Sequence, residues 1–271
     1  MDKLFDLVTD PYDRKARATP ALLTVLPVVV PLVCQFGTKN PILTGILGVL
    51  GTCGAIYAAA SIARGRGKLL EEVLVKEWGG LPTTIILRHR DTFLEGGTKR
   101  RYHLDALQRL GIQLPTAKEE AADDAAADDS YRSVGRRLRE LTREDKKLLL
   151  KENIAYGFHR NMLAMKGVGV ILSIIGVIYG LALAGAIKLD PVEFDIHGLL
   201  PPGLSGGLTL LVSLAMLAAW LGYFNKAQVR AMGYTYAERL LEKLAGLPRL
   251  RGRPAGPAAH PANAAPGAPN P

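Results

Sequence analysis

Cysteine is scarce in this chain. Cys34 and Cys53 are the only cysteines among 271 residues, and both stand in apolar surroundings. A disulfide framework needs several paired cysteines in an oxidising compartment, so the sequence excludes a small disulfide-stabilised fold. We expect both side chains to act as small apolar groups that fill space between helices.

Motifs of common nucleotide-binding and catalytic classes are also missing. The chain has no glycine-rich dinucleotide-binding fingerprint, no P-loop and no zincin helix. Two H-x-D triplets, at residues 89–91 and 103–105, have ligand types that suit a metal, but neighbouring arginines and lysines would repel a cation. We expect these triplets to be exposed residues on basic helices. The sequence thus predicts no catalytic residue, no cofactor and no metal site.

Charged side chains are missing from four long apolar stretches, residues 18–38, 40–63, 167–187 and 201–225. Each is about 20 residues or longer, the length a helix needs to cross about 30 Å of hydrocarbon. We therefore predict an all-α membrane protein with four transmembrane helices, arranged as two hairpins that flank a helical cytoplasmic domain. Histidine is missing from the stretches too, which disfavours an ion-coupled transporter or a proton relay.

Basic residues are distributed unevenly around these stretches. Four lysines and arginines precede the first stretch, 21 lie between residues 64 and 166, and seven follow the fourth. The two connectors carry one each, Lys39 and Lys188. The positive-inside rule therefore places both termini and the central segment in the cytoplasm, with both connectors outside. We assign the net charge of +9 to orientation and to anionic lipid headgroups, with no nucleic-acid partner.

These signals divide the chain into six segments. Each is defined by its charge and apolar pattern, and we expect the first apolar stretch to remain as an anchor. The segments are a cytoplasmic amphipathic segment (1–19), a transmembrane hairpin (20–63), a helical cytoplasmic domain (64–166), a second transmembrane hairpin (167–225), a cytoplasmic amphipathic helix (226–247) and a disordered tail rich in proline, alanine and glycine (248–271).

The central domain contains several helix signals. Thr83 is expected to cap a short helix that ends at Asp91, and Thr98 one that ends at Leu110. Thr116 and Glu119 have the spacing of a capping box. An apolar seam follows, suited to a partner helix in this chain or in a coiled coil with a second copy, and is formed by Tyr131, Val134, Leu138, Leu141 and Leu148. From about Asp145 one helix should continue into the third span.

Glycine is concentrated in two of the spans. The second span has Gly45, Gly48, Gly51 and Gly54, and the third has Gly176 and Gly180 on a stripe with Gly169 and Ser173. Helices in lipid associate through close packing, which small residues permit. We expect these two spans to pack against each other, either within one chain or between copies in a homo-oligomer.

Residues 79–90 form a candidate anion site. Two glycines and a threonine-rich helix start would present free backbone amides, followed by basic side chains. The residues concerned are Gly79, Gly80, Thr83, Thr84, Arg88, His89 and Arg90. A phosphate-bearing ligand or a lipid headgroup would fit there. An ordinary turn and helix cap is the alternative.

A second candidate site lies where the long helix enters the third span. Its polar side chains share one region of the helix and are Glu152, Tyr156, His159, Arg160 and Asn161. This cluster at the membrane mouth could gate a pore or receive a signal. Alternatively, it docks the domain onto the membrane part.

Three segments carry a resemblance: "EWGGLPTTIILRHRD", "LPTAKEEAADDAAADDSY" and "ENIAYGFHRN". Together they resemble an uncharacterised family of multi-pass membrane proteins from actinobacteria. The resemblance implies a bacterial plasma membrane and supplies no activity. The layout is also similar to that of four-span effectors in antiphage signalling systems.

The sequence therefore predicts a non-enzymatic membrane effector, pore or scaffold. Its cytoplasmic helices would receive a protein partner or an anionic, nucleotide-type signal. The alternative is a membrane enzyme or lipid-handling protein that uses residues 79–90 and His103.

Overall fold

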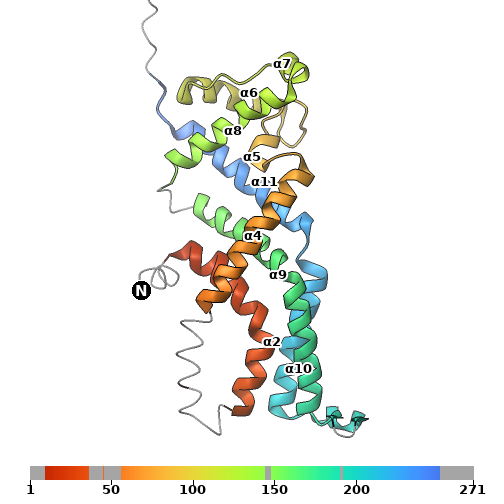
Figure 1. Cartoon of the computed structure of the whole chain (residues 1–271). Coiled ribbons are helices and arrows are strands. Elements are labelled where there is room, and N and C mark those ends of the chain that lie inside the picture. The colour runs from red at the N-terminus through yellow and green to blue at the C-terminus, as the bar shows by residue number, and fades with distance from the viewer. Residues whose placement is uncertain (1–9, 37–44, 46–55, 144–147, 190–191, 251–271) are drawn as a thin grey trace, which may run out of the picture.

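Helices dominate the computed structural model, which describes residues 10–36, 45, 56–143, 148–189 and 192–250. The molecule is long, with two distinct ends (Figure 1). The helices α2 (Thr19–Phe36), α9 (Leu148–Leu183) and α10 (Gly203–Ala218) pack together at one end. Shorter helices gather at the other end. The all-α prediction is confirmed for the described part of the chain, apart from one short hairpin.

Three helices are long and apolar enough to cross a membrane: Asp13–Gln35, Leu148–Leu183 and Gly203–Tyr223. They contain most of the first, third and fourth predicted stretches. The first consists of η1 (Asp13–Ala18) and α2, and the last continues from α10 into η5 (Ala219–Tyr223). The second stretch, 40–63, lies mostly outside the described residues, and α4 (Ile56–Trp78) begins near its end. A fourth span therefore stays a prediction.

The other end is a helical domain with its own apolar core. It contains α5 (Pro82–Ile85), α6 (Gly96–Asp105), η3 (Ala106–Leu110), α7 (Ala117–Ala122), α8 (Asp124–Leu141), α11 (Lys226–Glu242) and η6 (Lys243–Gly246). Tyr131, Val134 and Leu138 of α8 are fully buried among leucines of α11 and η6. The predicted seam thus packs within the chain. Leu141 and Leu148 remain exposed.

The helix starts were predicted unevenly. The capping box of Thr116 and Glu119 is confirmed at the start of α7. Thr83 and Thr98 were wrongly predicted as caps, because α5 follows Leu81 and ends at Ile85, and α6 follows Glu95. Pro82 has a fixed φ that suits the first helical position, which explains the earlier start of α5. The Thr83 side chain is buried, with its Oγ1 3.2 Å from where a Cβ on Gly135 would lie.

A single helix connects the two ends, as predicted. α9 has 36 residues and no break within it. At 1.5 Å per residue it is about 54 Å long. Its first turns lie near the domain, and its last turns pack against both α2 and α10 (Figure 1). It is the element through which the domain and the bundle share one backbone.

The small-residue stripe of α9 faces α2 and α10. A Cβ added to Gly176 would lie 2.3 Å from Ser213 Oγ and 2.7 Å from the carbonyl oxygen of Pro27, and one added to Gly180 would lie 2.9 Å from Leu210 Cγ. The expectation that this stripe packs on the second span is therefore corrected to the first and fourth spans. In the second span, Gly45 has nothing within 4 Å of its Cβ position, and Gly48, Gly51 and Gly54 lie outside the described residues.

A short hairpin that the sequence did not predict follows α9. Its strands are β1 (Ile187–Leu189) and β2 (Val192–Phe194), paired antiparallel, and the 3-10 turn η4 (Ile196–Leu199) follows. It lies at the end of the bundle opposite the helical domain (Figure 1).

Candidate functional site

The protein's own carboxylates occupy the predicted anion segment. Arg88 donates from Nε to Asp128 Oδ1 at 2.8 Å and from Nη2 to Asp128 Oδ2 at 2.6 Å. The same Nη2 donates to the carbonyl oxygen of Gly79 at 2.6 Å, and the arginine is 8% exposed. Burial alone would lower the pKa of Arg88, but the hydrogen bond and charge of Asp128 outweigh burial and raise it. This bidentate ion pair, together with the hydrogen bond to Gly79, fixes the turn at Gly79 (the glycine turn) to α8.

Glu120 of α7 takes the backbone amides that were assigned to a ligand. Its carboxylate accepts from the amide of His89 at 2.7 Å, from the amide of Arg90 at 3.3 Å and from the Tyr131 hydroxyl at 2.6 Å. The Arg90 guanidinium also pairs with Glu120 at 3.1 Å. The segment therefore does bind anions, but in this structure they are Glu120 and Asp128. Thr83 and Thr84 are buried within α5.

Sequence reasoning missed Glu120 and Asp128 because they lie 31 and 40 residues from their partners. The available signal was charge complementarity. Residues 88–90 hold two arginines, and residues 119–129 hold six carboxylates. A basic turn and an acidic helix in one small domain favour an internal ion-pair network over an external ligand.

This network makes stability depend on pH. Burial alone would raise the pKa of Glu120, but hydrogen bonds from Tyr131, His89 and Arg90 outweigh burial and lower it below 4.5. Such a carboxylate stabilises the fold above its ordinary pKa, and this contribution is lost as pH falls through the lowered value. We expect the free energy of unfolding to fall below about pH 4.5, and expect Glu120→Gln to flatten that fall.

Thermal unfolding in detergent, followed by circular dichroism from about pH 3 to pH 7, measures this effect. The control is Glu140→Gln, because the Glu140 side chain is 56% exposed in its pair with Arg137. The control should keep the wild-type pH dependence. An unchanged slope in Glu120→Gln would contradict the assignment.

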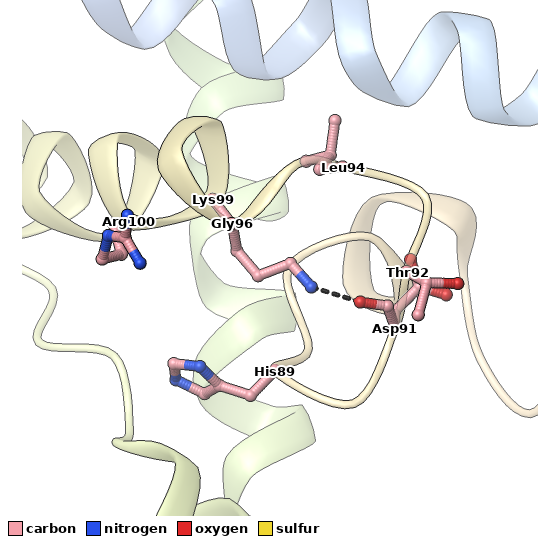
Figure 2. Close-up of a pocket in the computed structure, with 7 residues that line it drawn as sticks. All are labelled: His89, Asp91, Thr92, Leu94, Gly96, Lys99 and Arg100. Atoms are coloured by element: carbon pink, nitrogen blue, oxygen red, sulfur yellow. Dashed lines mark hydrogen bonds between the residues drawn. The ribbon is translucent and has the colours of Figure 1, made fainter.

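A cavity of about 450 Å³ lies beside this network, at the start of α6 (Figure 2). It is lined by His89, Asp91, Thr92, Leu94, Gly96, Lys99 and Arg100. Figure 2 shows the Lys99 side chain reaching to the carbonyl oxygen of Asp91, with the His89 ring on the other side of the opening. Of the predicted anion residues, only His89 lines this cavity.

The cavity wall is basic. Lys99 is 6% exposed, and its Nζ donates to the carbonyl oxygens of Arg88, at 2.7 Å, and Asp91. Arg100 is exposed, and within the described ranges neither cation forms an ion pair. The Asp91 carboxylate accepts from the amide of Phe93 at 3.0 Å. The amides of the first turn of α6 add partial positive charge.

The histidines of the two H-x-D triplets come together, whereas their aspartates do not. The rings of His89 and His103 are 4.7 Å apart, and His103 Nε2 lies 2.9 Å from the carbonyl oxygen of Leu87. Burial lowers the pKa of His103, and the charges of His89 and Lys99 add to the shift. Asp105 pairs instead with Arg109 at 2.8 Å. Over the described residues, no group of three or more metal-ligating side chains forms.

The predicted cluster at the membrane mouth is split between two sides of α9. Glu71 of α4 accepts from the Tyr156 hydroxyl at 2.9 Å and from Arg160 Nη1 at 2.6 Å. Asn161 Nδ2 donates to the carbonyl oxygen of Ala16 at 2.6 Å. These three predicted residues thus join α9 to α4 and to η1. We call this group, with Glu71, the polar junction.

His159 and Glu152 do not belong to the polar junction. His159 Nε2 lies 3.3 Å from the Tyr223 hydroxyl, toward η5, and Glu152 is half-buried one turn before Tyr156 on α9. Sequence reasoning missed Glu71 and also Gly67, where an added Cβ would lie only 1.9 Å from Asn161 Oδ1. The geometry is that of a docking contact between helices.

Comparison with protein-family models, with curated protein sequences and with solved structures gives no match to this chain. The fold itself defines a class: the protein is helical, and three of its helices are long and apolar enough to cross a membrane and are joined to a helical domain.

Proposed function

We propose that the chain is a multi-pass protein of a bacterial inner membrane, with four spans and with both termini and the helical domain in the cytoplasm. Three apolar helices support the spans. The 21 basic residues between 64 and 166 support a cytoplasmic domain through the positive-inside rule.

We further propose that the protein is a non-enzymatic membrane effector whose domain receives an anionic, nucleotide-type ligand. The donors of residues 79–90 are engaged by Glu120 and Asp128, so we place the ligand in the neighbouring cavity. Arg100, which is exposed and not paired with a carboxylate in the described part of the chain, and the amides of the first turn of α6 favour a phosphate-bearing molecule there, and the buried Lys99 adds its charge. A simpler form of this proposal is a membrane scaffold that binds a protein partner through the same face.

One observation carries the effector proposal: α9 is a single helix of 36 residues that belongs to both ends of the molecule. The polar junction ties α9 to α4, and α4 leads directly to the glycine turn that Arg88 holds. A ligand that shifts the cavity wall therefore acts on elements continuous with the bundle.

Induced expression in a bacterial host, with membrane potential and growth followed together, tests this proposal. We expect the wild-type protein in the membrane fraction to depolarise the cells and slow growth. Arg100→Glu reverses a charge at the cavity and should abolish both effects at equal membrane content. Arg136→Glu is the control, because Arg136 is an exposed residue on α8 outside the cavity.

Unchanged potential and growth, with wild-type protein in the membrane fraction, would contradict the effector version. Depolarisation that persists in Arg100→Glu would contradict the cavity as the ligand site. Recovery of the protein from the soluble fraction without detergent would contradict the membrane assignment.

A further inference from the structure

The hairpin after α9 has two chemically different faces. Its register pairs Ile187 with Phe194 and Lys188 with Glu193. Because successive residues of a strand point to opposite sides, the Ile187–Phe194 pair and the Lys188–Glu193 pair lie on opposite faces. Lys188 Nζ is 3.2 Å from Glu193 Oε2, and this ion pair is more than half exposed. The hairpin is therefore apolar on one face and charged on the other.

The apolar side of this region is unusually exposed. Large side chains with at least three quarters of their surface exposed follow one another here: Phe194 (78%), Ile196 (75%), Leu200 (84%) and Leu204 (86%). Exposed large apolar side chains gathered within one short segment are typical of a surface that something covers. We call these four residues the apolar ledge.

The ledge is fixed to the bundle. The amide of Asp195 donates to the carbonyl oxygen of Ala186 at 3.0 Å, which continues the hairpin to the end of α9. A Cβ added to Gly198 would lie 2.6 Å from the backbone nitrogen of Ala186, so η4 packs closely on that end. The hairpin extends sideways from the bundle end (Figure 1).

The ledge is also continuous with the exposed apolar surface of α10. Leu204, Leu208 and Leu211 have i, i+4, i+7 spacing, so they follow one face of this helix, and all three are exposed. If α10 crosses a membrane, that face contacts lipid. The ledge extends the same surface to where the hydrocarbon meets the headgroups.

We propose that the apolar ledge rests in the headgroup–acyl boundary of the leaflet opposite the helical domain, with the Lys188–Glu193 pair facing water. This inference rests on the proposed membrane insertion of α9 and α10. A lipid surface fits better than a second copy, because the ledge continues the exposed face of α10, which itself contacts lipid if α10 crosses a membrane. Interfacial elements of this kind combine an apolar face in lipid with a charged face in water.

Matched spin labels test the proposal. Cysteines are introduced one at a time at Phe194 and Glu193, neighbours on opposite faces of β2, and at Ile175, a half-exposed position within α9. The background is the full chain with Cys34→Ala and Cys53→Ala. Each labelled protein is reconstituted into phosphatidylcholine–phosphatidylglycerol vesicles, and label accessibility to oxygen and to a water-soluble nickel chelate is measured.

We expect the labels at 175 and 194 to favour oxygen, and the label at 193 to favour the nickel chelate. If the label at 175 favours oxygen but the labels at 194 and 193 are equally accessible to the two reagents, the membrane assignment stands and the ledge proposal is overturned. If 175 itself favours the chelate, both are overturned. Dipolar broadening at 194 that disappears on dilution with unlabelled protein would show a second copy on the ledge, which also overturns the proposal.

A second variant keeps both native cysteines, so its result does not depend on whether the cysteine-free chain folds. Phe194→Trp in the otherwise unchanged chain should be quenched by lipids brominated near the headgroup, beyond the constant signal of Trp78 and Trp220. Glu193→Trp should show no such excess. Equal quenching of the two variants would overturn the proposal.

Discussion

Gly176→Ile should prevent the three-helix bundle from forming its native packing. An added Cβ would lie 2.3 Å from Ser213 Oγ, 2.7 Å from the Pro27 carbonyl oxygen and 2.9 Å from the Pro27 Cβ. Because these atoms belong to α10 and α2, both helices would have to move away from α9. Overpacking costs about 1–3 kcal/mol when side chains can adjust, and we expect more than about 3 kcal/mol here because backbone is in the way.

The same substitution at Gly167 provides the control for this prediction. Gly167 lies on α9 as well, is exposed, and has nothing within 4 Å of its Cβ position. Gly167→Ile should unfold at close to the wild-type temperature in detergent, whereas Gly176→Ile should aggregate or unfold far earlier. Equal stability of the two variants would show that α2, α9 and α10 do not pack as described.

Asp128→Asn should strongly destabilise the helical domain. The substitution leaves the Arg88 guanidinium buried and facing a neutral amide, since the side chains of Arg88 and Asp128 are 10% and 13% exposed. Removing one partner of a buried ion pair costs about 3–5 kcal/mol, mainly because the other charge is left uncompensated. Chemical denaturation of the purified protein, followed by circular dichroism, measures the loss.

Two further variants sharpen this second prediction. Glu140→Gln removes a partner from the exposed Arg137–Glu140 pair and should cost less than about 1 kcal/mol. The double variant Arg88→Met with Asp128→Leu removes both buried charges and should recover much of the stability lost in Asp128→Asn. A double variant no more stable than Asp128→Asn would argue that the loss comes from packing and not from an uncompensated charge.

The fold class could be predicted because it depends on local sequence. A segment long enough to cross hydrocarbon has to be apolar over about 20 residues, so α10 and the second half of α9 are visible as uncharged stretches. The capping box at Thr116 was equally visible, because both partners lie within four residues. The Thr83 cap was not, because Pro82 and tertiary burial of Thr83 decided the start of α5.

Contacts between distant segments could not be predicted in the same way. The small-residue stripe on α9 showed that some helix comes close, but the partner depends on where large side chains complement it. Trp220 of η5 fills the space at Gly169, and Leu210 of α10 fills the space at Gly180. Likewise, Arg88 was singled out in the sequence but its partner Asp128 was not, because only the tertiary structure brings the two together.

The continuity of α9 has a mechanical consequence. A continuous helix has no loop at which its two halves could move separately, so the first turns of α9 cannot be displaced without pulling on its last turns. A displacement of the domain end would thus be passed along one backbone to the end of the bundle where the hairpin lies.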